Sequence, residues 1–303
     1  MPCFFVSIES QIPHKMKNIL VPTDFTGTSE LALAWAKFLA KHYSQGGQET
    51  MLTLAHVTQP YIPDSTLPTG EVGVGMMAVQ EMEDVGELNL QEIADQLERE
   101  GFKTRIESRV GSIDSEIVDV ADELKPEMIV MGRSHIDSFF DWLAGSSAAD
   151  VAMTAHCPVL VVPTLDPNRN NPVRLQNIAY ATQLEFDENH ILRPVVQLAR
   201  TFQSNLRLVK IKALNQPNVH DDRQYLAQIE SEFGRDRFVE DTVDADNVIE
   251  GLTKYMQTHQ IDLLVMATRE RDFLSKLLNP SLTKRMVLNS DVPVLVYHAE
   301  ENY

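Results

Sequence analysis

Two short segments with glycine and serine carry the clearest chemical potential of this 303-residue chain. Gly132 follows an apolar run directly, and Gly145-Ser146-Ser147 stands thirteen residues later, at the start of an expected helix. A glycine has no Cβ, so backbone N–H groups such as those of Gly132 and Arg133 can approach an anion closely. A helix N-terminus adds free N–H groups and a favourable dipole. Together these segments predict a phosphate site.

Asp24 is the second candidate binding residue, because it ends the first apolar run, Lys17–Asp24. If the strand order is 3-2-1-4-5, the first and fourth strands are neighbours at the point where the order reverses, which is where open α/β sheets bind ligands. Asp24 and Gly132 would then face one crevice, and the carboxylate suits a ribose hydroxyl. The alternative is that Asp24 only caps the following turn.

Apolar runs alternate with helical patterns, which is typical of βαβ units around a parallel sheet. We expect strands at Lys17–Asp24, Met51–Val57, Lys103–Val110, Met128–Met131 and Pro158–Pro163. We expect helices after a turn at Thr26–Ser29, with Thr28 or Ser29 as N-cap, and over 76–100, Ser115–Leu124 and Ser146–Thr154. In the helix 76–100 we expect one apolar side, formed by Met82, Val85, Leu88, Ile93 and Leu97.

The second half of the chain repeats the first. Residues 131–163 align without a gap on residues 266–298, at an offset of 135, and both copies close with Pro-Val-Leu-Val. The second copy is shorter by about 19 residues between its second and fourth strands. We therefore expect an N-terminal extension at 1–15, domains at 16–163 and 174–303, and a Pro- and Asn-rich linker at 164–173. If the second copy acts as an internal partner of the first, the closing strands, Val159–Val162 and Val294–Val296, should lie side by side as an internal pseudo-dimer.

Composition narrows the class of function. The net charge of −18 provides no excess of cations to neutralise phosphates, which argues against nucleic acid and anionic membranes as partners. Two cysteines make no disulfide framework and no metal-ligand spacing, so a reducing, cytoplasmic compartment is expected. No catalytic or metal-binding constellation is visible.

On these residues the chain resembles the universal stress protein family as two tandem copies. The resemblance rests on Ile19–Asp24, Leu54–Val57, Val110-Gly111, Met131-Gly132 with Gly145-Ser146-Ser147, and His156–Val162. It implies two Rossmann-like domains of the adenine nucleotide alpha hydrolase-like type, each a five-stranded parallel sheet of order 3-2-1-4-5 flanked by helices. It also implies ATP as a ligand, Mg²⁺ only together with ATP, and homodimers among family members.

The resemblance implies which residues line such a nucleotide site. They are Pro22, Thr23, Asp24, Val57, Met131, Gly132, Arg133, His135, Gly145, Ser146 and Ser147. His135 stands where nucleotide-binding members carry a glycine, so a side chain replaces exposed backbone at that position.

The second copy departs further from the pattern. Asp24 aligns with Gln183, Gly132 with Ala267, His135 with Glu270 and Gly145 with Pro280. Because Glu270 adds negative charge where phosphates would lie, we expect this copy to be structural. The function expected is that of a regulatory nucleotide binder. Two alternatives remain: an interaction protein without nucleotide that binds a protein partner, and an enzyme acting on an adenylated substrate.

Overall fold

The structure, a computed structural model, describes residues 16–45, 47, 49–60, 71–133, 147–164, 173–182, 189–213, 222–234, 238–269 and 280–299. Within these residues ten strands form a single sheet. They are β1 (Lys17–Pro22), β2 (Thr50–Thr58), β3 (Lys103–Val110), β4 (Met128–Arg133), β5 (Val159–Pro163), β6 (Asn177–Ala181), β7 (Asn205–Ala213), β8 (Val239–Ala245), β9 (Leu263–Arg269) and β10 (Val294–Ala299). The expected extension at 1–15 and most of the expected linker lie outside the described residues.

The strand order is β3-β2-β1-β4-β5-β10-β9-β6-β7-β8. Each copy therefore has the order 3-2-1-4-5, since β6 to β10 repeat β1 to β5. The neighbours within each copy are parallel. The expected α/β fold with two five-stranded parallel units is confirmed.

The two units join through β5 and β10, which pair antiparallel. Leu160 lies opposite Leu295, and these two leucines occupy the same position of the repeat, 135 residues apart. A contact in which equivalent residues face each other is that of a two-fold axis, as in a symmetric dimer. The prediction that the closing strands lie side by side is confirmed.

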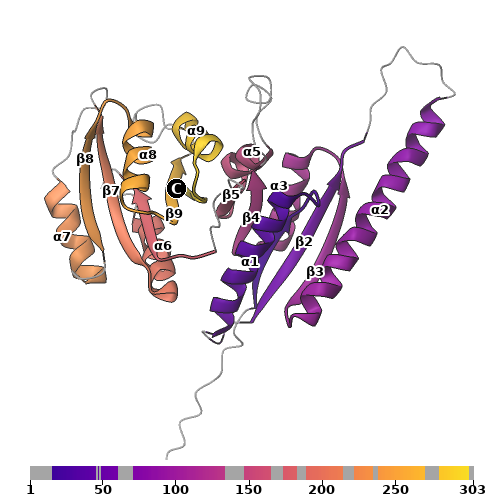
Figure 1. Ribbon diagram of the computed structural model, residues 1–303, viewed down its shortest axis with the longest axis horizontal. Coiled ribbons are helices and arrows are strands. Elements are labelled where there is room, and N and C mark those ends of the chain that lie inside the picture. Colours follow the sequence, from indigo (N-terminus) through magenta and orange to yellow (C-terminus); the bar gives the residue numbers. More distant parts are fainter. Residues whose placement is uncertain are drawn as a thin grey trace, which may run out of the picture.

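Helices cover both faces of the sheet (Figure 1). One face carries α1 (Gly27–Gln45), α2 (Glu71–Arg99), α6 (Asn189–Phe202) and α7 (Asp222–Phe233). The other carries α3 (Ile113–Leu124), α5 (Ser147–Thr154), α8 (Val248–Thr258) and α9 (Pro280–Asn289). Each face has one apolar core that includes buried residues of both copies, so the halves share their hydrophobic interior. On the first face Phe202 of α6 stacks on Phe38 of α1, with ring centroids 5.4 Å apart.

Several local expectations need correction. Strand β1 ends at Pro22 and not at Asp24, α2 begins at Glu71 and not at residue 76, and α3 begins at Ile113 and not at Ser115. Helix α1 begins at Gly27, so neither Thr28 nor Ser29 is the N-cap. Strand β4 runs on to Arg133, two residues beyond the expected end. In α2 the buried side is formed by Gly86, Leu90, Ala94 and Leu97, whereas Met82, Val85 and Leu88 are exposed. The expected apolar side was wrong because α2 has two apolar stripes, and only one of them meets the sheet.

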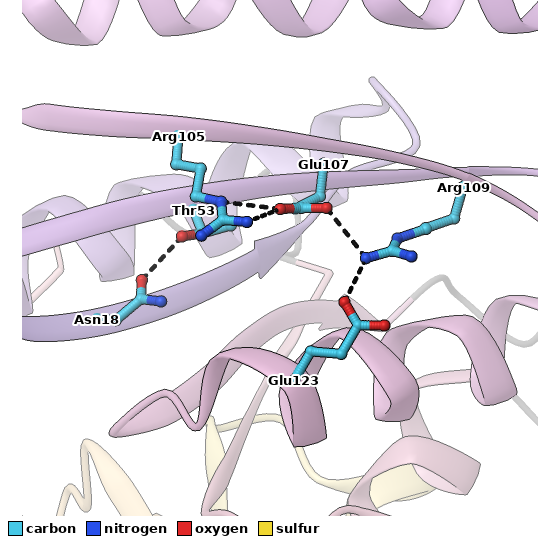
Figure 2. Close-up of polar contacts among 6 residues, drawn as sticks. All are labelled: Asn18, Thr53, Arg105, Glu107, Arg109 and Glu123. Carbon is cyan, nitrogen blue, oxygen red and sulfur yellow. Dashed lines mark hydrogen bonds and ion pairs between the residues drawn. The ribbon is translucent and has the colours of Figure 1, made fainter.

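The outer strand β3 is protected by charge (Figure 2). Glu107 accepts from Arg105 Nε at 2.8 Å, and Arg109 Nη2 lies 3.2 Å from Glu107 and 2.6 Å from Glu123 of α3. Charged side chains on an edge strand disfavour pairing with another chain. This side of the sheet is therefore not presented for strand addition.

Candidate functional site

The candidate site lies at the edge of the sheet where β1, β2 and β4 end. Strand β1 lies between the other two, with Pro22 opposite Ala55 of β2 and Ile19 opposite Met128 of β4. Since these strands are parallel, their carboxyl ends share one edge. The structure describes eight of the eleven expected residues, whose backbones lie near this edge: Pro22, Thr23, Asp24, Val57, Met131, Gly132, Arg133 and Ser147. The side chains of Val57, Met131 and Arg133 point elsewhere. His135, Gly145 and Ser146 lie outside the described residues.

The turn after β1 is held by its own side chains. Asp24 Oδ1 accepts from the Thr26 hydroxyl at 2.6 Å and from the Thr26 N–H at 3.1 Å. The Thr23 hydroxyl accepts from the Phe25 N–H and donates to Ser29 Oγ. Phe25 sits at φ 61°, in the left-handed region that side chains other than glycine seldom adopt. Asp24 therefore does cap this turn, and its side chain is also exposed at the sheet edge.

Asp24 is held in its ionised form. Burial raises the pKa of its carboxyl, but hydrogen bonds from Thr26, together with smaller ones from Ser29 and its own backbone, outweigh this effect, and the net pKa lies below the ordinary 3.8. At neutral pH the group is an acceptor only, which suits a hydroxyl donor such as that of a ribose.

Replacing Thr26 with valine removes the hydroxyl donor and keeps the backbone donor, so the pKa of Asp24 is expected to rise. A lowered native-state pKa stabilises the fold above the unfolded-state value, and this contribution is lost as pH falls through the native value. The Asp24 contribution should therefore disappear at a higher pH in the variant. Titration of the Asp24 carboxyl carbon by NMR measures this directly, and an unchanged pKa would contradict the hydrogen-bond assignment.

A close contact with Thr28 explains why position 132 is a glycine, and this contact could not be read from the sequence. A Cβ added there would lie 2.6 Å from the carbonyl oxygen and 2.7 Å from Cγ2 of Thr28. The first turn of α1 therefore packs directly against the end of β4. This close approach holds the Asp24 turn beside β4, so Gly132 shapes the site even before any ligand is considered.

The other β2 and β4 residues turn their side chains away from the edge. Val57 and Met131 are 9 % and 5 % exposed and belong to the core beneath α3 and α5. Arg133, 8 % exposed, crosses to the second copy, where its guanidinium donates to the carbonyls of Leu288 and Ser290 at the end of α9, the latter at 2.8 Å. Burial lowers the pKa of Arg133, and the cation remains suited to the negative end of a helix.

Helix α5 starts at the same edge, with Ser147 as its first residue. Lys284 of α9 pairs with Asp150 of α5 at 2.6 Å. Helix α9 therefore contacts both flanks of the segment between Arg133 and Ser147: Arg133 on one side and α5 on the other. The second copy thus supports the first at this edge.

Sequence reasoning missed several contributors to this edge. Thr26 acts locally, through the turn that Asp24 caps, whereas the Thr28 carbonyl acts through a tertiary contact with Gly132. Thr58, at the end of β2, has a buried hydroxyl without a partner among the described residues. An unsatisfied polar atom at a sheet edge is a point where a ligand atom or a water would be favourable.

The equivalent edge of the second copy differs. Ala267 replaces Gly132 and is buried, and Pro280 begins α9 where the first copy has Gly145. Gln183 and Glu270 lie outside the described residues. In the part of the chain that the structure describes, no three His, Cys, Asp or Glu side chains are arranged to hold a metal ion. No described helix has the length and apolar character needed to cross a membrane.

Comparison with known proteins matches this architecture. A model of the universal stress protein family matches residues 15–163 and 195–298. Universal stress protein MJ0531 of Methanocaldococcus jannaschii is 30 % identical over 148 residues, 48 % of this chain and 81 % of that protein. Universal stress protein MJ0577 of the same organism is 28 % identical over 156 residues, 48 % of this chain and 94 % of that protein. A universal stress protein structure from Archaeoglobus fulgidus aligns with a TM-score of 0.67 at 15 % identity, covering 94 % of this chain and 97 % of that one.

Proposed function

The chain belongs to the universal stress protein family, and from this premise we propose that its first copy is a regulatory nucleotide-binding domain. ATP is the first candidate ligand. The observation that carries the proposal is the adjacency of β1 and β4, which places the ionised Asp24 turn, Gly132 and the start of α5 at one sheet edge. A carboxylate, backbone N–H groups and a helix N-terminus at such an edge suit a ribose and its phosphates.

Each residue of the site has a distinct role in this proposal. Asp24 accepts a hydrogen bond from a ribose hydroxyl. The backbone N–H group of Gly132 and the N-terminus of α5 at Ser147 contact phosphate oxygens, whereas the Arg133 N–H faces β5 in the sheet. The Arg133 side chain bonds to the carbonyls at the end of α9, so it is not available to contact the phosphates. Mg²⁺ would arrive with ATP and be held mainly by its phosphates.

We assign the second copy a structural role. It lacks a counterpart of Gly132 and carries Glu270 and Pro280 in the equivalent loop. Because β5 and β10 pair with each other, neither is left as an edge for another chain. In this proposal the internal contact replaces the subunit contact of a homodimer, and the chain acts in the cytoplasm as a single two-copy unit.

Calorimetry on full-length, ligand-stripped protein tests the nucleotide proposal. ATP with Mg²⁺ is expected to bind, and Asp24→Ala is expected to weaken binding at least about tenfold, which corresponds to about 1.4 kcal/mol. Asp246→Ala is the matched control, because Asp246 is exposed and lies in the second copy. No heat and no thermal shift at millimolar ATP would refute the proposal. An assay of phosphate release with the same protein separates binding from turnover, and we expect at most slow, incidental hydrolysis of ATP.

A further inference from the structure

Helix α2 presents an apolar stripe to solvent on its outward face. Met77, Met82, Val85 and Leu88 are 76 %, 56 %, 52 % and 70 % exposed. Met82, Val85 and Leu88 are spaced three residues apart, so they lie on successive turns. The buried face of the same helix, formed by Gly86, Leu90, Ala94 and Leu97, already makes the contact with the sheet. The outward stripe is therefore not needed to hold α2 in place.

The length of α2 is particular to the first copy. It has 29 residues, whereas its counterpart α7 has 12. The N-terminal turns of α2 extend beyond the ends of β2 and β3 (Figure 1). The stripe from Met77 to Leu88 is roughly 17 Å long at the ~1.5 Å rise of a helix, or about three turns. That is the length over which one helix places its anchor residues on another.

Helix α2 is acidic up to its last residue, Arg99. From Glu71 to Glu98 the helix carries eight acidic residues and no Lys or Arg. Glu81, Asp84, Glu87, Glu92 and Asp95 are exposed. Among the described residues none of these five carboxylates is paired with a Lys or Arg; Asp84 and Asp95 accept only from glutamine amides on the same helix. Methionine is polarisable and adapts its shape, which is typical of surfaces that accept helical partners.

We propose that the outward face of α2 is a docking surface for a basic amphipathic helix of a partner protein. The apolar side of that helix would cover Met77, Met82, Val85 and Leu88, and its Lys and Arg residues would face the flanking carboxylates. A second copy of this chain would bring an equally acidic face, and an anionic membrane would also be repelled. Of the three candidates, namely a basic helix, a second copy of this chain and an anionic membrane, the acidic charge of α2 therefore favours the basic helix.

The test uses the full chain and two synthetic peptides of about 18 residues, long enough to form a helix on binding. Both contain only Leu and Lys in equal proportion, one ordered to give an apolar face and the other scrambled so that it has none. The amphipathic peptide is expected to bind at least about tenfold more tightly than the scrambled one, because only it can use both apolar and charged contacts. Equal affinities would show a non-specific charge effect and overturn the proposal.

Two sets of variants locate the contact. The triple variant Met82→Gln, Val85→Gln and Leu88→Gln should bind the amphipathic peptide no more tightly than the scrambled one. Glutamine is chosen because it keeps the helix propensity of α2 while removing the apolar side chains. Val239→Gln, at an exposed valine of β8, is the control. Glu81→Gln with Asp84→Asn and Glu92→Gln should weaken binding and flatten its salt dependence. Asp119→Asn with Asp244→Asn and Asp246→Asn, which remove equal charge elsewhere, should not.

Circular dichroism and thermal unfolding of every variant show whether the fold is kept. Equal effects of the α2 set and its control set would refute the assignment to α2. Sedimentation of the protein alone gives the remaining outcome. If the chain dimerises and the three-glutamine variant abolishes the dimer, the occupant is a second copy and the proposal is wrong.

Discussion

Replacing Gly132 with alanine is expected to lower the free energy of unfolding by about 1–3 kcal/mol, the usual effect of forcing an atom into a packed site. The new Cβ would meet the carbonyl oxygen, the carbonyl carbon and Cγ2 of Thr28 at 2.6–2.7 Å. Backbone atoms cannot rotate away, so α1 and β4 must separate. Urea denaturation followed by circular dichroism measures the loss.

Gly27→Ala is the matched control. Gly27 is the first residue of α1, and a Cβ there meets nothing within 4 Å. Its replacement is expected to leave stability unchanged or to raise it by less than about 1 kcal/mol, since alanine favours helix. If Gly132→Ala were as well tolerated as Gly27→Ala, the contact of α1 with β4 would not be as close as described. Gly132→Ala should also weaken the proposed nucleotide binding, because it moves the Asp24 turn away from β4.

Replacing Leu295 with alanine is expected to cost about 2–5 kcal/mol and to loosen both copies at once. Leu295 is 2 % exposed and lies opposite Leu160 of the first copy. Its side chain belongs to the core that both copies share. Hydrogen exchange should therefore become faster in β5 as well as in β10.

Leu208→Ala distinguishes this coupling from a general loss of stability. Leu208 is 1 % exposed and lies in β7, far from the junction in the strand order. A similar cost is expected, with faster local exchange confined to the second copy. Should Leu295→Ala also spare β5, the two copies would be independent units despite their shared sheet.

Much of the fold could be predicted because its signals are local and repeated. The apolar runs that become β1, β4 and β5 recur in order as β6, β9 and β10, and buried parallel strands need little more than such runs. The repeat also predicted the β5–β10 junction, because a duplicated subunit tends to keep the symmetric contact of a dimer. The glycine and serine residues indicated the candidate phosphate loop of the first copy, and the repeat identified its degenerate counterpart.

The direction of individual side chains was harder to predict. Met82, Val85 and Leu88 have the helical spacing of a buried face, yet they are exposed, because Gly86, Leu90, Ala94 and Leu97 form a second stripe that fits the sheet more closely. Spacing shows that residues share a side of a helix. It does not show which side meets the protein.

The sequence by itself indicated the duplication, the alternation of strands and helices, and the residues expected at the candidate edge, since each follows from patterns within one short segment or its repeat. The strand order 3-2-1-4-5 was expected from the resemblance to the family. Only the tertiary structure decided how that edge is held. Gly132 packs against Thr28, Arg133 bonds to the end of α9, and hydrogen bonds from Thr26 lower the pKa of Asp24. Two of these three contacts join residues more than a hundred positions apart, and such contacts exist only after the sheet has brought the elements together.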